Sequence, residues 1–179
     1  MKMAIPINKD FDREPLERIG TLTGGADGLV YKLGDDKVAK FQWPTNWESW
    51  LWRVSPSGNK IRKEYEIARE LYDAGISVPN PYGVFKLRKP KGEDWSEIWV
   101  PRRYPAFVME YKEGGIPYPK YLDFSTQRKI EELVRIEREK VADLGFRTSD
   151  SLGWENTLWV PKEERIYLID FTRWELSEK

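Results

Sequence analysis

The sequence predicts an α+β fold in which an antiparallel sheet with one helix precedes a smaller, mainly helical part. Three observations support this. Residues 16–42 hold short apolar runs separated by turn residues, with Gly-Asp-Asp at 34–36 as a tight-turn signal. Residues 60–74 and then 125–144 place apolar side chains at spacings of three and four. The 179 residues suffice for one domain or for two small lobes that share a site.

The elements follow in order along the chain. Three strands are expected in 16–42, and residues 43–60 form an irregular insertion. A helix over 60–74 should end at Gly75, the expected C-cap. Residues 78–89 read as extended chain running into a strand, and 106–111 as a short apolar strand. Ser125 is the expected N-cap of the second helix, and residues 157–171 form a hairpin that turns at 161–164. The expected apolar side of the second helix consists of Ile130, Leu133, Val134, Ile136, Val141 and Leu144.

The composition excludes several kinds of chemistry. There are 30 basic and 30 acidic side chains, so no surplus of positive charge favours nucleic acid, and no nucleic-acid partner is expected. The chain has no Cys and no His, which excludes disulfides, thiolate nucleophiles, imidazole bases and the usual zinc sites. A metal would have to bind to oxygen, which favours Mg²⁺ or Mn²⁺.

The chain has no apolar run of membrane-spanning length, and charge and proline interrupt its first 15 residues before a signal-peptide core could form. We therefore expect a cytoplasmic protein with no membrane partner. A charged fraction of 34%, no Cys and only 3 Met resemble the composition of proteins from hot environments.

Three features could bind phosphate, and each has a simpler structural interpretation. Gly24, Gly25 and Gly28 lie between two predicted strands, where they could let backbone approach a ligand or form an ordinary hairpin turn. Lys40 ends the apolar run Val-Ala-Lys and could pair with phosphate or extend its ammonium to the surface. Glu64, taken alone, is a solvated residue of the first helix.

The order of these features, followed by AGISVPNPYGV, FVMEYKEGG, DSLGWENTLWV and IYLIDF, resembles that of the eukaryotic-like protein kinase superfamily. The likeness extends over residues 18–174 and is strongest to its small atypical and aminoglycoside-phosphotransferase-like branches. It implies an N-lobe of residues 1–112 with the Gly-rich loop, the Lys and the hinge. Residues 113–179 would form a reduced C-lobe with the catalytic loop and the metal-binding Asp.

The resemblance also implies roles for individual residues, with ATP and Mg²⁺ (or Mn²⁺) as cofactors. Lys40 would neutralise the non-transferred phosphates and Glu64 would orient it. Asn156 and Asp170 would bind the metal, and Asp150 would be the catalytic base. The expected nucleotide-binding residues are the loop residues Gly24, Gly25, Gly28 and Val30, then Met109 behind the adenine, and Glu110, Tyr111 and Lys112 in the hinge.

The sequence departs from the family pattern at three motifs. Thr23 stands where the loop pattern has a Gly, so the loop could be stiffer. Asp150 lies six residues before Asn156, where the family has five, so one extra residue must be accommodated or the base is displaced and the site binds nucleotide without efficient transfer. Asp150 could also be a simple turn residue. Thr172 replaces the Gly of the family's Asp-Phe-Gly, which favours a fixed Asp170.

Only seven residues follow Thr172, so we expect no activation loop and no protein-substrate platform of the family type. The chain also has nine Trp, which could replace core that a short second lobe lacks or form a docking patch for a protein partner. Those considered for the patch are Trp43, Trp47, Trp50, Trp52, Trp95 and Trp99.

The sequence is therefore interpreted as an ATP- and Mg²⁺-dependent phosphotransferase resembling a minimal atypical Ser/Thr protein kinase. The alternatives are a nucleotide-binding pseudokinase or regulatory module that acts through a partner, and a small-molecule kinase.

Overall fold

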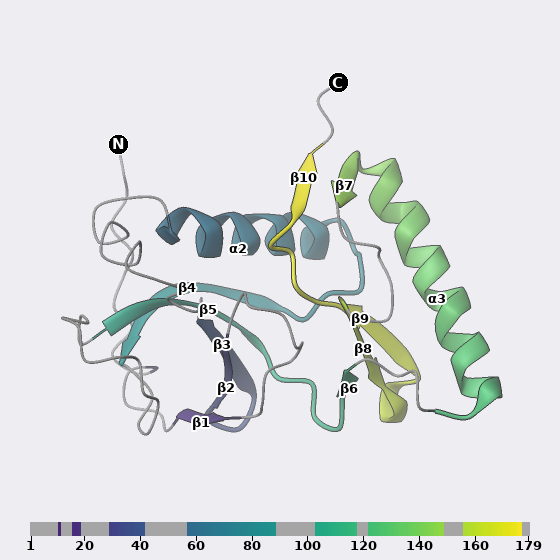
Figure 1. The fold of residues 1–179 in the computed structure, drawn as a ribbon, viewed down its shortest axis with the longest axis horizontal. Coiled ribbons are helices and arrows are strands. Elements are labelled where there is room, and N and C mark those ends of the chain that lie inside the picture. The colour runs from purple at the N-terminus through teal and green to yellow at the C-terminus, as the bar shows by residue number, and fades with distance from the viewer. Residues whose placement is uncertain are drawn as a thin grey trace. The chain divides into compact units, whose positions relative to one another are not determined.

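The computed structural model describes residue 11 and residues 16–18, 29–41, 57–88, 103–117, 122–148 and 156–176. Within these ranges the chain is α+β, with two α-helices, a five-stranded antiparallel sheet and two smaller sheets (Figure 1). The chain divides into two compact units. The first consists of Met1–Tyr65 and Pro81–Tyr111, and the second of Glu66–Asn80 and Lys112–Lys179.

The first unit contains the five-stranded sheet, in the order β1-β2-β3-β5-β4. The second and third strands expected in 16–42 are confirmed, and the turn at 34–36 joins β2 to β3 with Gly34 at a φ of 64°. The first strand, expected over 18–23, overlaps β1 at Arg18, and its other residues lie outside the described part of the chain. The fifth strand begins three residues earlier than the sequence predicted. The strand bounds are β1 Leu16–Arg18, β2 Leu29–Leu33, β3 Lys37–Phe41, β4 Pro81–Arg88 and β5 Arg103–Glu110.

One face of this sheet forms a hydrophobic core. Because side chains alternate between the two faces of a strand, every second residue of β2, β3 and β5 points into it. Tyr31 and Phe41 meet edge to face, with ring centroids 5.7 Å apart. The buried members of the core are Tyr31, Leu33, Ala39, Phe41, Leu87, Ala106 and Val108.

Helix α2 (Ser57–Asp73) confirms the first predicted helix and begins three residues earlier. Gly75 has a φ of 80°, a conformation that glycine adopts without steric cost. Its N–H donates to the Tyr72 carbonyl, and the Ile76 N–H donates to the Leu71 carbonyl, both at 3.0 Å. This pair of bonds is the Schellman motif, so the sequence identified the C-terminal end of the helix correctly.

In the second unit, helix α3 (Phe124–Asp143) confirms the other predicted helix, but its N-cap is Asp123 and not Ser125. The Asp123 carboxylate accepts the Thr126 backbone N–H at 3.0 Å and the Ser125 hydroxyl at 2.5 Å. A carboxylate accepts several hydrogen bonds at once and interacts favourably with the positive end of the helix dipole, which explains why the aspartate caps the helix.

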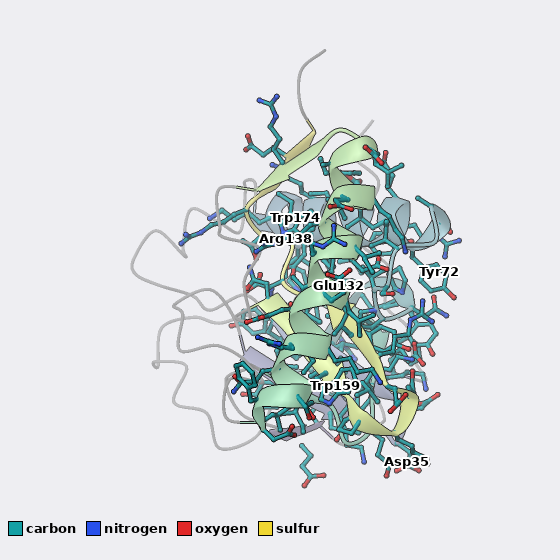
Figure 2. The ribbon with its side chains drawn as sticks, turned by 90° about the vertical axis from the view of Figure 1, so that its right-hand side faces the viewer. Asp35, Tyr72, Glu132, Arg138, Trp159 and Trp174 are labelled. Carbon is teal, nitrogen blue, oxygen red and sulfur yellow. The ribbon has the colours of Figure 1, made fainter. Side chains whose placement is uncertain are left out.

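The apolar side of α3 is narrower than predicted. Ile130, Val134 and Val141 are buried, whereas Leu144 is 42% exposed and is the C-cap. Figure 2 shows α3 facing the viewer, with Trp159 beside its N-terminal half. The Lys129 ammonium lies 5.9 Å from the centroid of the Trp159 ring.

Two small sheets complete the second unit. Strands β8 (Thr157–Val160) and β9 (Arg165–Leu168) form the predicted hairpin, which turns through the 3₁₀ helix η2 (Pro161–Glu163), and β6 (Ile116–Pro117) pairs with β8. Strand β7 (Phe146–Thr148) pairs with β10 (Trp174–Leu176), a pairing that the sequence did not predict. Helix α3 contacts β7 and β9. Neither described helix is both long and apolar enough to cross a membrane.

Candidate functional site

The first candidate group lies on the sheet face opposite the hydrophobic core. Lys40 alternates with the core residues Ala39 and Phe41 on β3, so its side chain points to the other face. In register, Lys40 lies between Val30 of β2 and Phe107 of β5. Directly opposed residues of an antiparallel sheet share a face, so these three side chains line up across the sheet.

Helix α2 supplies the partner of Lys40. The Lys40 Nζ donates to Glu64 Oε1 at 2.6 Å, and the two side chains are only 9% and 3% exposed. One residue along α2, the Tyr65 ring meets the Phe107 ring at a centroid distance of 5.9 Å, which packs this turn of the helix on the same sheet face. The sequence-predicted pair is therefore brought together.

Met109 shares this face. It lies opposite Val38, which is two residues from Lys40 on β3 and so points the same way. Val30 and Met109 are 3% and 7% exposed. The structure thus places three predicted residues from three strands, Val30, Lys40 and Met109, on one side of the sheet.

Backbone groups of the predicted hinge already make hydrogen bonds within the protein. The Tyr111 N–H donates to the Asp36 carbonyl at 2.8 Å and extends the pairing of β5 with β3. The Lys112 carbonyl accepts the Gly115 N–H at 3.0 Å in the following turn. Glu110, the first of the three predicted hinge residues, is the last residue of β5.

The Lys112 side chain contacts two residues of the second unit. Its ammonium lies 4.2 Å from the centroid of the Tyr167 ring and 3.7 Å from Glu163 Oε1. The Tyr167 hydroxyl donates to Glu163 Oε2. Burial raises the pKa of Tyr167, the bond to Glu163 adds to this, and the Lys112 ammonium opposes it. The side chain of Lys112 therefore packs against the β8–β9 hairpin.

The second candidate group contains the two predicted metal ligands. Asn156 immediately precedes β8, and Asp170 is the second residue after β9. The Ile169 N–H donates to the Asn156 carbonyl at 2.9 Å, so the residue before Asp170 is bonded directly to the backbone of Asn156. Asn156 is 7% exposed.

Asp170 has an unusual backbone conformation. Its φ is 64°, in the left-handed region that residues other than glycine seldom adopt. Its Oδ1 accepts the Thr172 hydroxyl at 2.6 Å. Such conformations cost about 1–3 kcal/mol and cluster at functional sites. Oxygen donors such as the Asp170 carboxylate and the Asn156 amide fit a hard cation like Mg²⁺.

Several predicted residues lie outside the described part of the chain. These are the loop residues Gly24, Gly25 and Gly28, the proposed base Asp150, and the six Trp residues Trp43, Trp47, Trp50, Trp52, Trp95 and Trp99.

The structure also reveals residues that the sequence analysis did not identify. Glu137 is buried on α3, where its carboxylate accepts the Ser77 backbone N–H at 3.0 Å. The signal was present in the sequence, because a charged residue stands between Val134 and Val141 in the apolar stripe of the helix.

Comparison with models of known protein families gives no match for this chain. Over 118 residues it is 32% identical to the Drosophila melanogaster protein "Neither inactivation nor afterpotential protein C". The aligned part is 62% of this chain and 7% of that protein, so the chain spans only a small part of its relative's length.

Proposed function

We propose that this protein is an ATP- and Mg²⁺-dependent phosphotransferase with a protein-kinase-like fold, located in the cytoplasm. The observation that supports this most directly is the buried pair of Lys40 on β3 and Glu64 on α2, at 2.6 Å. A strand Lys paired with a helix Glu is the arrangement that protein kinases require for activity.

A purely structural role explains this pair less well. Taking two charges out of water costs free energy that their attraction offsets only in part, so a buried ion pair contributes little to stability compared with apolar residues of similar volume. Lys40 also lies on the sheet face that carries Val30 and Met109, two of the residues expected to bind the nucleotide. A functional role for the ammonium fits both observations.

The proposed chemistry depends on neutralising the negative charge of the ATP phosphates. Lys40 would neutralise the non-transferred phosphates, and Glu64 would hold its ammonium in place. Asp170 and Asn156 would hold Mg²⁺, which supplies further neutralisation of phosphate charge when bound. Asp150 would orient the acceptor hydroxyl and accept its proton. Phosphoryl transfer needs mainly positioning and charge neutralisation, which a chain without His or Cys can supply.

The test combines a binding measurement with a turnover measurement. Binding of a fluorescent ATP analogue with Mg²⁺ should weaken in Lys40→Met and Asp170→Asn, and phosphoryl transfer to a generic protein or to the protein itself should fall at least about a hundredfold. Lys37→Met is the matched control, because Lys37 lies on the same strand but points to the opposite face. Turnover in Lys40→Met equal to that of the control would exclude the mechanism.

A nucleotide-binding pseudokinase or regulatory module is the second candidate. The spacing of six residues from Asp150 to Asn156 favours it, because one extra residue could displace the base. Binding of Mg²⁺ and nucleotide without turnover on any acceptor would support this candidate over the enzyme. An acceptor screen with aminoglycosides, sugars and choline would extend the test to a small-molecule kinase.

A further inference from the structure

Glu137 is a carboxylate on the buried side of α3. The residue is 7% exposed and lies between Val134 and Val141. Burying a carboxylate is costly unless hydrogen bonds satisfy it. Its Oε2 accepts the Ser77 backbone N–H at 3.0 Å, and its Oε1 accepts the Lys140 ammonium at 2.8 Å. One oxygen therefore anchors the segment that follows α2, and the other pairs with a lysine on the same helix.

Ser77 connects Glu137 to strand β9. Its carbonyl accepts the Leu168 N–H at 2.8 Å, and its hydroxyl accepts the Arg165 Nε–H at 3.1 Å. Strand β9 is an edge strand of the sheet β6-β8-β9. Ser77 hydrogen-bonds to its free edge, on the side away from β8. All three polar groups of this buried serine are used.

These bonds lead directly to Asp170. The Leu168 N–H donates a hydrogen bond to the Ser77 carbonyl. The next N–H, that of Ile169, donates to the Asn156 carbonyl at 2.9 Å. Asp170 follows at a φ of 64°. A residue stays in this sparsely populated conformation only when its surroundings hold it there. The two residues before Asp170 are thus held by backbone hydrogen bonds, Leu168 to Ser77 and Ile169 to Asn156.

We propose that Glu137 is a positioning residue for Asp170. Through Ser77 it fixes the end of β9 and so the direction of the Asp170 carboxylate, although it lies on another element and would contact neither metal nor nucleotide. This inference rests on the proposed function, in which Asp170 holds Mg²⁺. Residues that orient a metal ligand from outside the ligand shell typically change metal affinity about 10- to 100-fold when replaced.

The test uses two variants of nearly the same shape. Glu137→Gln keeps an oxygen that accepts the Ser77 N–H, whereas Glu137→Met fills the space without an acceptor. The readout is the Mg²⁺ concentration that gives half-maximal binding of a fluorescent, non-hydrolysable ATP analogue. We expect about a tenfold increase in Glu137→Met and less than about twofold in Glu137→Gln. Glu139→Gln, on the exposed side of the same helix, should match the wild type.

A second readout separates positioning from loss of fold. Binding of the same analogue without Mg²⁺ reports the folded fraction, and it should be the same in all three variants. If Glu137→Met does not fold, Glu137→Asp takes its place, because its shorter side chain keeps the charge but does not reach Ser77. The inference would be overturned if folded Glu137→Met, or Glu137→Asp in its place, showed the same Mg²⁺ dependence as the wild type.

The wild type and Asp170→Asn are measured in the same titration. If the wild type shows no Mg²⁺-dependent nucleotide binding, the proposed function fails and this inference fails with it. If Asp170→Asn loses the Mg²⁺ dependence while Glu137→Met retains it in full, only the role of Glu137 is wrong.

Discussion

The ammonium of Lys40 lies 2.6 Å from the carboxylate of Glu64, and both residues are buried between a sheet face and helix α2. Replacing either partner leaves a buried charge without its counter-ion. We expect Lys40→Met and Glu64→Leu each to lower the free energy of unfolding by about 3–5 kcal/mol, measured by urea denaturation.

The double variant Lys40→Met/Glu64→Leu provides the control. It should recover much of the lost stability, because two apolar side chains replace the pair and no buried charge remains. Additive losses in the double variant would show that the two residues do not interact in solution.

The left-handed backbone of Asp170 predicts a difference between two substitutions that both remove its carboxylate. Glycine adopts a φ of 64° without steric cost, whereas alanine does not. Asp170→Gly should therefore be more stable than Asp170→Ala by about 1–2 kcal/mol in thermal or urea unfolding. Equal stability of the two variants would mean that this residue has an ordinary φ in solution.

Two adjacent glycines should respond differently to a side chain. A Cβ on Gly115 would lie 2.8 Å from Leu158 Cδ2 and 2.9 Å from the Lys112 carbonyl oxygen, so Gly115→Ala should cost about 1–3 kcal/mol of stability. Gly114 has a φ of 69°, which strains any side chain, but a Cβ on it would have no neighbouring atom within 4 Å. Because Asn is among the residues that best tolerate this region, Gly114→Asn should cost less than about 1 kcal/mol of stability and less than Gly115→Ala. A Gly115→Ala protein as stable as the wild type would contradict this packing.

The N-cap of α3 predicts a dependence of stability on pH. Hydrogen bonds from the Ser125 and Thr126 side chains, and then from the Thr126 backbone, lower the pKa of Asp123 below its ordinary value of 3.8. A lowered pKa means that the stabilisation is present above pH 3.8 and is lost as the pH falls below it. The melting temperature of the wild type should therefore exceed that of Asp123→Asn at neutral pH.

The two melting temperatures should then converge in acid, because the wild-type carboxyl becomes protonated and loses its charge. Asn retains an oxygen that can cap the helix, so this comparison isolates the contribution of the charge. A difference that stays constant from about pH 7 to about pH 2 would show that the charge of Asp123 does not stabilise the helix.

The elements that sequence analysis predicted well are those whose signals are local. Helix α2 was identified from its apolar spacing and from Gly75, and the β8–β9 hairpin from its apolar runs on either side of a turn. The N-cap of α3 was misplaced by two residues because Asp123 and Ser125 can both cap a helix, and the sequence alone does not show which one does.

The candidate residues divide in the same way. Lys40 and Glu64 are predicted from their residue types and their order in the sequence. They are 24 residues apart, and they pair only because α2 packs on the sheet face. The contact between Glu137 and Ser77 spans 60 residues, and β7 pairs with β10 although the β8–β9 hairpin lies between them in the sequence. A local pattern can mark a residue such as Glu137 as unusual, but it does not identify the distant partner of that residue.

Local sequence was thus enough to specify the helices, the hairpin and the residue types able to bind phosphate and a hard cation. Three-dimensional packing determined which of these side chains are buried, which are paired, and that Asp170 takes a left-handed conformation. The physical reason is the separation along the sequence of the residues that interact. Helical periodicity and turns arise from residues a few positions apart, whereas a buried carboxylate or a strained backbone is stable only when distant segments supply its partners.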